Sequence, residues 1–435
     1  MVNNPITSPA DSAEPLPAAI SEQRLHEPPA NWRWGFWSLI VTQFQGAFND
    51  NALKFLVIYL IVERDFPAAL RDRLVLLVGA LFALPYILFS LAGGYFADRY
   101  SKRAVTIGTK VFEIGVMIFA LASLAARNIP MEAAAVFLVS TQGALFGPSK
   151  YGLLPELLPE KKLSWGNGVI ELGTFLAAIT ATMAAGFLAV AFRGRQTWSG
   201  IILLGFTLFG LLTSFGISRV PAADPLRKFR ANPFADLAAQ LRIIARDGVL
   251  VWAIVSNTYL WFLAALLQFV IVVYGHDVLR VDETQISYLQ AAVGMGIGIG
   301  SLSAGYLSRG KIEYRLIPLG AMGMTIFGFL VSRNGLGVWP VRIDLALLGF
   351  FGGFYAVPLN ALIQHRPARE LKGGIIAAGN LLSFVGVFLA AGFYFLFASV
   401  AHLRPGAIFL AGAIMTLGAG FYAVYGWSRY SRHVE

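Results

Sequence analysis

The residues best suited to chemistry lie in a short polar run, Phe48-Asn49-Asp50-Asn51-Ala52-Leu53-Lys54. The run interrupts an apolar segment of 27 residues, Phe36 to Val62, which is long enough to cross a bilayer. A charged side chain at mid-membrane costs about 2.5–3.5 kcal/mol on insertion scales, so Asp50 predicts a functional polar pathway. We expect its carboxylate to face a water-filled cavity built by the N-terminal helices. The alternative is a structural ion pair with Lys54, one helical turn away.

Further ionisable side chains lie within apolar segments of the first half of the chain: Lys110, Glu113, Lys150 and Glu171. In the second half the middles of the apolar segments carry no charge, and their amides include Gln268, Gln290, Asn360 and Asn380. This one-sided charge suits an amphiphile, because cations would bind a phosphate, an anion would bind an ammonium and apolar walls would receive an acyl chain. Structural alternatives are snorkelling of Lys150, a Lys110–Glu113 pair at i,i+3, and pairing of Glu171 with the preceding span.

The composition is that of a membrane protein. The chain is 57% hydrophobic and 13% charged, with a mean hydropathy of +0.66, whereas soluble domains carry about 25% charged residues. With no cysteine, the chain has no disulfide, Cys-ligated metal or thiol nucleophile. The five histidines are scattered through tails and loops, so we expect no metal site and no cofactor. The net charge of +10 is spread over short loops, which indicates membrane topology rather than nucleic-acid binding.

Twelve apolar segments predict an all-α membrane protein of twelve transmembrane helices in two six-helix bundles. They lie near 36–62, 73–97, 104–126, 132–154, 164–191, 200–218, 248–275, 284–307, 315–332, 343–363, 373–400 and 406–428. The expected domains are a disordered tail (1–30), a first bundle (31–218), a linker (219–247), a second bundle (248–428) and a short tail (429–435). Lys and Arg number 21 on the side that holds both termini and 10 on the other, which predicts cytoplasmic termini.

The linker contains an amphipathic helix. Asn232-Pro233 supplies an N-cap and a proline at the first helical position. The helix then carries one apolar stripe: Phe234, Leu237, Leu241 and Ile244. We expect it to lie on the membrane surface and to link the two bundles.

The two halves resemble each other at corresponding places. Phe146-Gly147-Pro148-Ser149-Lys150 matches Ala356-Val357-Pro358-Leu359-Asn360, and each is followed by a span that starts near a Gly-Asn pair. Such matches favour parallel internal repeats. Pro148 and Pro358 are expected to break or kink their helices beside a cavity, or else to be ordinary membrane kinks. Gly296, Gly300 and Ala304 form a small-residue stripe that predicts close helix packing.

The join between the second and third segments reads Gly94-Tyr95-Phe96-Ala97-Asp98-Arg99-Tyr100-Ser101-Lys102-Arg103. It resembles the signature loop of the major facilitator superfamily, with Ser101 where that family usually has glycine. We expect Gly94 to let two helices approach, Asp98 to cap a neighbouring helix, and Arg99, Lys102 and Arg103 to hold the loop at the inner leaflet. The resemblance implies a conformational latch made by these five residues. The alternative is a basic cytoplasmic loop that happens to contain an aspartate. The matching second-half stretch, Gly305 to Lys311, lacks the aspartate and predicts a weaker latch.

Three runs narrow the resemblance: Phe48 to Leu53, Gly147 to Leu157, and Gly352 to Leu362. They look like bacterial lysophospholipid transporters and the transporter portion of fused proteins that reacylate 2-acylglycerophosphoethanolamine. The resemblance implies a monomer among membrane lipids that moves lysophospholipids to the inner leaflet by alternating access. It also implies a functional partner, an acyltransferase/acyl-carrier-protein synthetase. Our hypothesis is that Asp50 binds the head-group amine and that Lys110 or Lys150 binds the phosphate. The predicted substrate-binding set is Asn49, Asp50, Asn51, Lys54, Lys110, Glu113, Lys150, Glu171 and Asn360.

Two rival functions remain open. Proton-coupled drug exporters usually carry Arg-x-x-Gln-Gly in the fourth span, whereas Val139 stands at the Arg position before Gln142-Gly143. The exporter is therefore the second choice, although Asp50, Glu113 or Glu171 would still be able to carry a proton. Membrane acyltransferases typically use His-x-x-x-x-Asp, and the nearest run, His365 to Glu370, ends in Glu. We therefore expect no enzyme activity.

Overall fold

The computed structural model describes residues 28–64, 66–228, 233–333, 335 and 337–430. Most of the two predicted tails, the predicted N-cap Asn232 and the side chain of Phe234 lie outside this part of the chain. Within it, the regular structure consists of helices and contains no strand.

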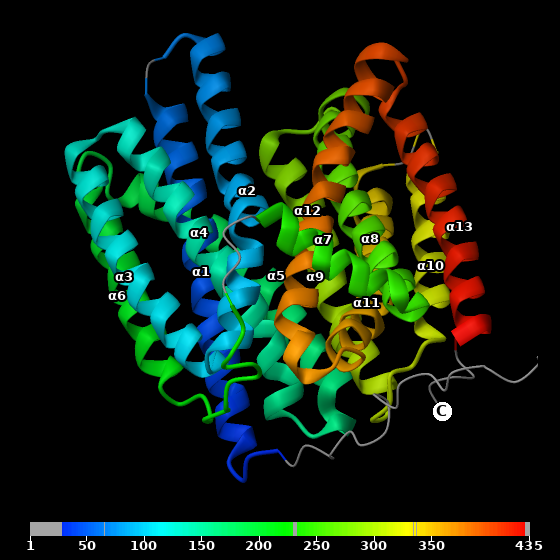
Figure 1. Cartoon of the computed structure of the whole chain (residues 1–435). Coiled ribbons are helices and arrows are strands. Elements are labelled where there is room, and N and C mark those ends of the chain that lie inside the picture. Colours follow the sequence, from blue (N-terminus) through cyan, green and yellow to red (C-terminus); the bar gives the residue numbers. More distant parts are fainter. Residues whose placement is uncertain (1–27, 65, 229–232, 334, 336, 431–435) are drawn as a thin grey trace, which may run out of the picture.

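The long helices form two groups that stand beside each other (Figure 1). The first group is α1 (Trp32–Glu63), α2 (Ala68–Arg99), α3 (Lys102–Ala126), α4 (Ile129–Leu157), α5 (Leu163–Ala191) and α6 (Thr197–Ser214). The second group is α8 (Gly248–Val273), α9 (Glu283–Leu307), α10 (Leu316–Val331), α11 (Val338–His365), α12 (Lys372–Phe395) and α13 (Pro405–Tyr430). Short elements are η1 (Glu160–Lys162), α7 (Pro233–Arg246), η2 (Tyr274–Val278), η3 (Arg369–Leu371) and η4 (Leu396–Val400).

Among the described residues, 10 helices are long and apolar enough to cross a membrane. The two remaining long helices are α1, which carries the polar run, and α10, which is 16 residues long. Both pack against helices of their own group. The structure is therefore consistent with the predicted twelve spans, while the count itself stays a prediction. The predicted domain boundaries also remain proposals.

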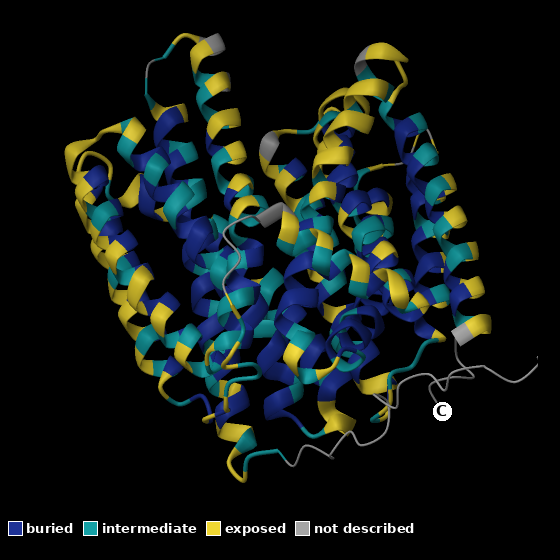
Figure 2. Cartoon of the chain, viewed as in Figure 1, coloured by how far each residue is buried: buried dark blue, intermediate teal, exposed yellow. Residues whose placement is uncertain are grey.

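The two groups meet mainly along two helix pairs, α2 with α12 and α5 with α9, and α4 and α5 also contact α11. The buried residues gather in the lower, central part of the molecule, where the groups meet (Figure 2). We call the end at which α1 begins the near end and the opposite end the far end. The near end is the lower one in Figure 1.

Two expectations about helices need correction. The apolar stripe of α7 packs on protein rather than lying free for a membrane surface. Its Ile244 is buried in the core of the second group, and Leu237 and Leu241 pack against that core. In addition, α4 and α11 run unbroken through Pro148 and Pro358, so neither proline breaks its helix, and a kink at either one stays a prediction.

The small-residue stripe of α9 lies against α11, as predicted. A Cβ added at Gly296 would lie 2.0 Å from the carbonyl oxygen of Ala346, and one at Gly300 would lie 2.0 Å from that of Phe350. Since no side chain fits in those gaps, the two backbones approach as closely as helices can. This contact fixes α11, which carries Asn360, within the second group.

We expect Gly300→Ala to destabilise the protein by about 1–3 kcal/mol or more, because the new methyl group must push two backbones apart. The matched control is Gly115→Ala on α3, where a Cβ would meet nothing within 4 Å. That change should be neutral or should stabilise its helix by up to about 1 kcal/mol. Thermal unfolding of both purified variants in detergent measures the difference. Equal melting temperatures would contradict the tight α9–α11 contact.

Candidate functional site

A cavity of about 340 Å³ lies between the two groups of helices. Its polar lining comes from both groups: Gln43, Asp50, Asn51, Ser90, Gln142, Lys150 and Thr174 from the first, and Asn257, Asn360, Gln364, Asn380 and Ser383 from the second. Aromatic rings complete it: Phe82, Tyr86, Phe146, Tyr151, Trp261 and Phe384. The expectation of a cavity built by the N-terminal helices alone is therefore incomplete, because the second group supplies one wall.

Asp50 lines this cavity from the middle of α1 and is 7% exposed. Its Oδ1 atom is buried and has no hydrogen-bond partner among the described residues. Its Oδ2 atom lies 3.0 Å from the point where a Cβ on Gly143 would stand, and the Tyr86 hydroxyl lies 2.6 Å from the same point. The absence of a side chain at Gly143 thus leaves room for the carboxylate at the cavity wall.

Lys54 does not pair with Asp50. Its Nζ donates a hydrogen bond to Oδ1 of Asn51 at 3.1 Å. The same ammonium lies over the rings of Phe55 and Phe82, 4.4 and 4.2 Å from their centroids. The structural alternative for Asp50, an i,i+4 ion pair, is therefore not found.

Lys150 supplies a cation to the cavity. Its Nζ lies 4.4 Å from the centroid of the Tyr151 ring, and the described residues give it no ion-pair partner. Glu171 lies behind Tyr151 and accepts hydrogen bonds from the Tyr151 hydroxyl at 3.2 Å and from Nδ2 of Asn360 at 3.2 Å. Glu171 therefore connects the first group to the second, while the Lys150 ammonium keeps its charge available.

Three predicted site residues lie behind the cavity wall. Lys110 and Glu113 form a fully buried ion pair, with 2.6 Å between Nζ and Oε2. Gln45 bridges them, since its Oε1 accepts from Lys110 at 2.7 Å and its Nε2 donates to Glu113 at 2.9 Å. Nδ2 of Asn49 donates to Glu113 at 3.4 Å and to the Thr207 hydroxyl at 2.6 Å. We call these five residues the buried network.

The buried network lies just behind the wall. A Cβ on Gly46, which lines the cavity, would stand 2.8 Å from Nζ of Lys110. The three predicted residues Asn49, Lys110 and Glu113 are all 0% exposed. Because none of the three lines the cavity and all are fully buried, they suit a structural role, and direct contact with a substrate is better assigned to Asp50 and Lys150.

At the near end, Asp98 caps α12. Its Oδ1 accepts from the backbone N–H of Gly373 at 2.7 Å, and its Oδ2 accepts from that of Gly374 at 2.9 Å. It also pairs with Arg227. A Cβ on Gly94 would stand 2.8 Å from the carbonyl oxygen of Gly373, so the two helices touch backbone to backbone. The capping and the close approach predicted from the sequence are both present.

The basic residues of the same loop contact protein. Arg99 donates to the backbone carbonyl of Arg227, and Lys102 forms a buried ion pair with Glu156 at 2.6 Å. Arg103 donates to the carbonyl oxygens of Ile217 and Phe215 at 2.7 and 2.9 Å, just beyond the end of α6.

Further contacts join the groups at the near end. Asn167 and Gln364 exchange two hydrogen bonds of 3.0 and 2.7 Å between their side chains. The Ser164 hydroxyl donates to the carbonyl oxygen of Lys311 at 3.0 Å. These bonds and the Asp98 cap hold the near ends together.

Sequence reasoning missed several cavity residues. Tyr86 stacks on Phe384 across the two groups, with 4.5 Å between ring centroids and 14° between planes. Asn257 and Ser383 line the second-group wall. Asn257 had a signal, because an amide inside the apolar run Val249 to Val273 needs a reason to be there. The aromatic residues gave none, since rings are common throughout the spans.

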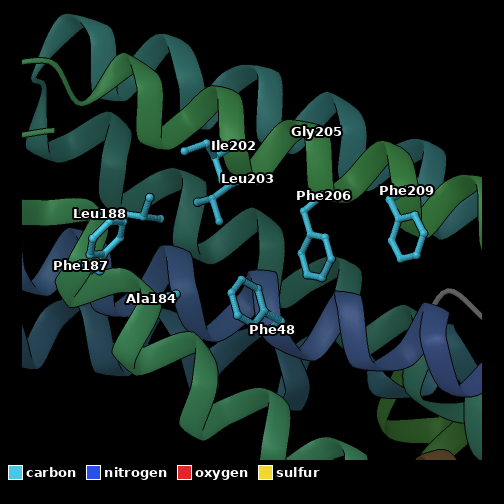
Figure 3. Close-up of a pocket in the computed structure, with 9 residues that line it drawn as sticks. All are labelled: Phe48, Ala184, Phe187, Leu188, Ile202, Leu203, Gly205, Phe206 and Phe209. Carbon is cyan, nitrogen blue, oxygen red and sulfur yellow. The ribbon is translucent and has the colours of Figure 1, made fainter. Parts of the chain in front are cut away.

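A second, wholly apolar pocket of about 530 Å³ lies on the back of α1, between α5 and α6. Figure 3 shows Phe48, Phe206 and Phe209 around it, with Leu188 and Leu203 nearby. It offers no polar group that would orient a head group. Among the described residues, no group of three His, Cys, Asp or Glu side chains is placed to hold a metal ion.

Comparison with known sequences places this architecture among transporters. A family model of the Major Facilitator Superfamily matches residues 39–391. The lysophospholipid transporter LplT of Klebsiella pneumoniae subsp. pneumoniae is 30% identical over 412 residues, which are 93% of this chain and 96% of that protein. LplT of Escherichia coli K12 is 28% identical over the same shares of the two chains.

Solved structures share the fold. The human organic anion transporter MFSD10 superposes with a TM-score of 0.75 at 15% identity, covering 91% of this chain and 100% of that one. FucP in the outward conformation gives a TM-score of 0.71 at 14% identity, with 90% and 98% covered. At these identities the likeness speaks for the fold alone.

Proposed function

The chain belongs to the Major Facilitator Superfamily and is therefore a membrane transporter, and from this premise we propose that it carries lysophospholipids. The observation that supports this substrate most is the cavity itself, where Asp50 and Lys150 leave one anion and one cation unpaired. A lysophosphatidylethanolamine head group carries the complementary ammonium and phosphate. The relatives named as lysophospholipid transporters support the same choice.

The proposed roles follow the placement of the residues. Asp50 binds the head-group amine and Lys150 the phosphate, with Asn51 and Lys54 shaping the cavity beside Asp50. Glu171 and Asn360 tie the two groups together across the cavity. The buried network, which includes Asn49, Lys110 and Glu113, holds α1 in register.

The proposed movement is alternating access in a bacterial inner membrane, toward the inner leaflet. The near end would be cytoplasmic, because the sequence assigns 21 of the Lys and Arg residues to the side that holds both termini and 10 to the opposite side. Gly94, Asp98, Arg99, Lys102 and Arg103 would form the latch that keeps this end closed. We further propose that the protein acts as a monomer, is not itself an enzyme, and delivers its cargo to a separate acyltransferase.

Replacing Asp50 with Asn is expected to lower uptake of labelled lysophosphatidylethanolamine by spheroplasts about 10- to 100-fold, because a charged hydrogen bond contributes about 1.5–3 kcal/mol. Uptake of lysophosphatidylglycerol, which has no amine, should fall much less. The control is Asp277→Asn, a carboxylate outside the cavity whose side chain is 56% exposed. Equal uptake by wild type and Asp50→Asn would remove Asp50 from the mechanism.

The second candidate, a proton-coupled exporter, is favoured by one observation, the unpartnered buried Oδ1 of Asp50. Collapse of the proton gradient separates the two functions. A lipid facilitator continues to transport under that condition, whereas a proton-coupled exporter stops.

A further inference from the structure

The neutral wall of the cavity contains a buried hydrogen-bond acceptor without a donor. Asn257 on α8 lines the cavity and is 7% exposed. Its Nδ2 donates to the hydroxyl oxygen of Ser383 on α12 at 3.2 Å. Its Oδ1 is buried and has no hydrogen-bond partner among the described residues. A buried amide oxygen left in this way costs about 1–3 kcal/mol, so it calls for an explanation.

Ser383 fixes which end of the amide is left open. The Ser383 hydroxyl donates its single proton to the carbonyl oxygen of Gly379 at 3.0 Å. It can therefore only accept from Asn257, which holds the amide nitrogen toward Ser383. The amide oxygen is left as the free atom, and it accepts a hydrogen bond but cannot donate one.

The charge of the surroundings selects the kind of donor. The cavity residues of the second group are amides, a serine and apolar side chains, and none of them is charged. An ammonium binds better to the carboxylate of Asp50 than to the amide oxygen of Asn257, because charge-assisted hydrogen bonds are about twice as strong as neutral ones. A neutral amide oxygen is matched by a neutral hydroxyl group.

We infer that Asn257, held by Ser383, binds the free glycerol hydroxyl of a monoacyl lipid. This inference rests on the proposed function and extends it to the choice among lipids. A lysophospholipid has a hydroxyl where a diacyl phospholipid has an ester, and an ester only accepts hydrogen bonds. Asn257 would then read the feature that defines a lysolipid, on the wall that faces the charged head-group residues.

The test compares palmitoyl lysophosphatidylethanolamine with its deoxy analogue, in which hydrogen replaces the free glycerol hydroxyl. Binding and transport are both measured on the full-length protein, in detergent and in proteoliposomes. Wild type should prefer the hydroxyl form about 3- to 10-fold, the effect of one neutral hydrogen bond. Asn257→Leu should bind and transport both lipids at the level of the deoxy form.

Ser256→Ala is the matched control, since Ser256 is the neighbouring buried polar residue of α8 and does not line the cavity. It should leave the preference unchanged. No preference in wild type, or an unchanged preference in Asn257→Leu, overturns the inference while lysolipid transport continues. If wild type neither binds nor transports any lysolipid, the proposed function fails and this inference fails with it.

Discussion

Lys110→Met is expected to destabilise the protein by about 3–5 kcal/mol, because it leaves the Glu113 carboxylate buried without its cation. Both side chains are 0% exposed, and the ammonium also bonds to Gln45. A loss of this size is a large part of the about 5–15 kcal/mol by which folded proteins are typically stable, so the variant should melt at a much lower temperature. The melting temperature and the monodisperse fraction in detergent measure it.

The double variant Lys110→Met/Glu113→Gln should recover part of the lost stability, because it removes both charges together. Lys150→Met is the contrasting variant. Lys150 has no ion pair among the described residues, so its removal should leave the melting temperature nearly unchanged while uptake of lysophosphatidylethanolamine falls at least tenfold. A stable Lys110→Met protein that has lost transport would instead assign the phosphate to Lys110.

Asp98→Asn is expected to loosen the near end and to raise the population that opens there at least tenfold. The change removes the negative charge of a carboxylate that accepts two backbone hydrogen bonds from α12 and pairs with Arg227. One charged hydrogen bond contributes about 1.5–3 kcal/mol. The natural chain contains no cysteine, so a single Cys placed at Ile363, which lines the cavity, reports opening directly. Its labelling rate is measured with an impermeant maleimide added to inside-out vesicles.

The control is Asp236→Asn. Asp236 also contacts Arg227, at 3.4 Å, but none of its described contacts reaches α12. It should label at the wild-type rate. Slow labelling in both variants would show that the Asn167–Gln364 bonds and the tight helix contacts keep the end closed without Asp98.

The sequence predicted best those parts of the fold in which a residue type is required by the local geometry. Gly94, Gly296 and Gly300 lie at backbone contacts where a Cβ would collide, and Asp98 caps a helix start. These are local requirements that the residue type reveals. The class of the fold followed in the same way from the length of the apolar segments.

The site was predicted less completely, because a sequence does not say which face of a helix is turned toward a cavity. Asn49 and Asp50 are neighbours, yet Asn49 turns to the buried network while Asp50 lines the cavity. From the sequence, Lys110 and Lys150 were equally good candidates to bind the phosphate. Their tertiary contacts distinguish them, because Lys110 pairs with Glu113 whereas Lys150 lines the cavity. The stripe of α7 was a similar case, since an apolar stripe fits a protein surface as well as a membrane.

The charged side chains of the cavity lie on one side only, so the electric field in the cavity is asymmetric. Asp50 and Lys150 belong to the first group, and the facing residues of the second group are neutral. A zwitterionic head group in this electric field has one orientation of lowest energy, so every head group would bind in the same orientation. The acyl chain would then always extend toward the uncharged second group. Only the walls of that group would need to accommodate acyl chains of different length.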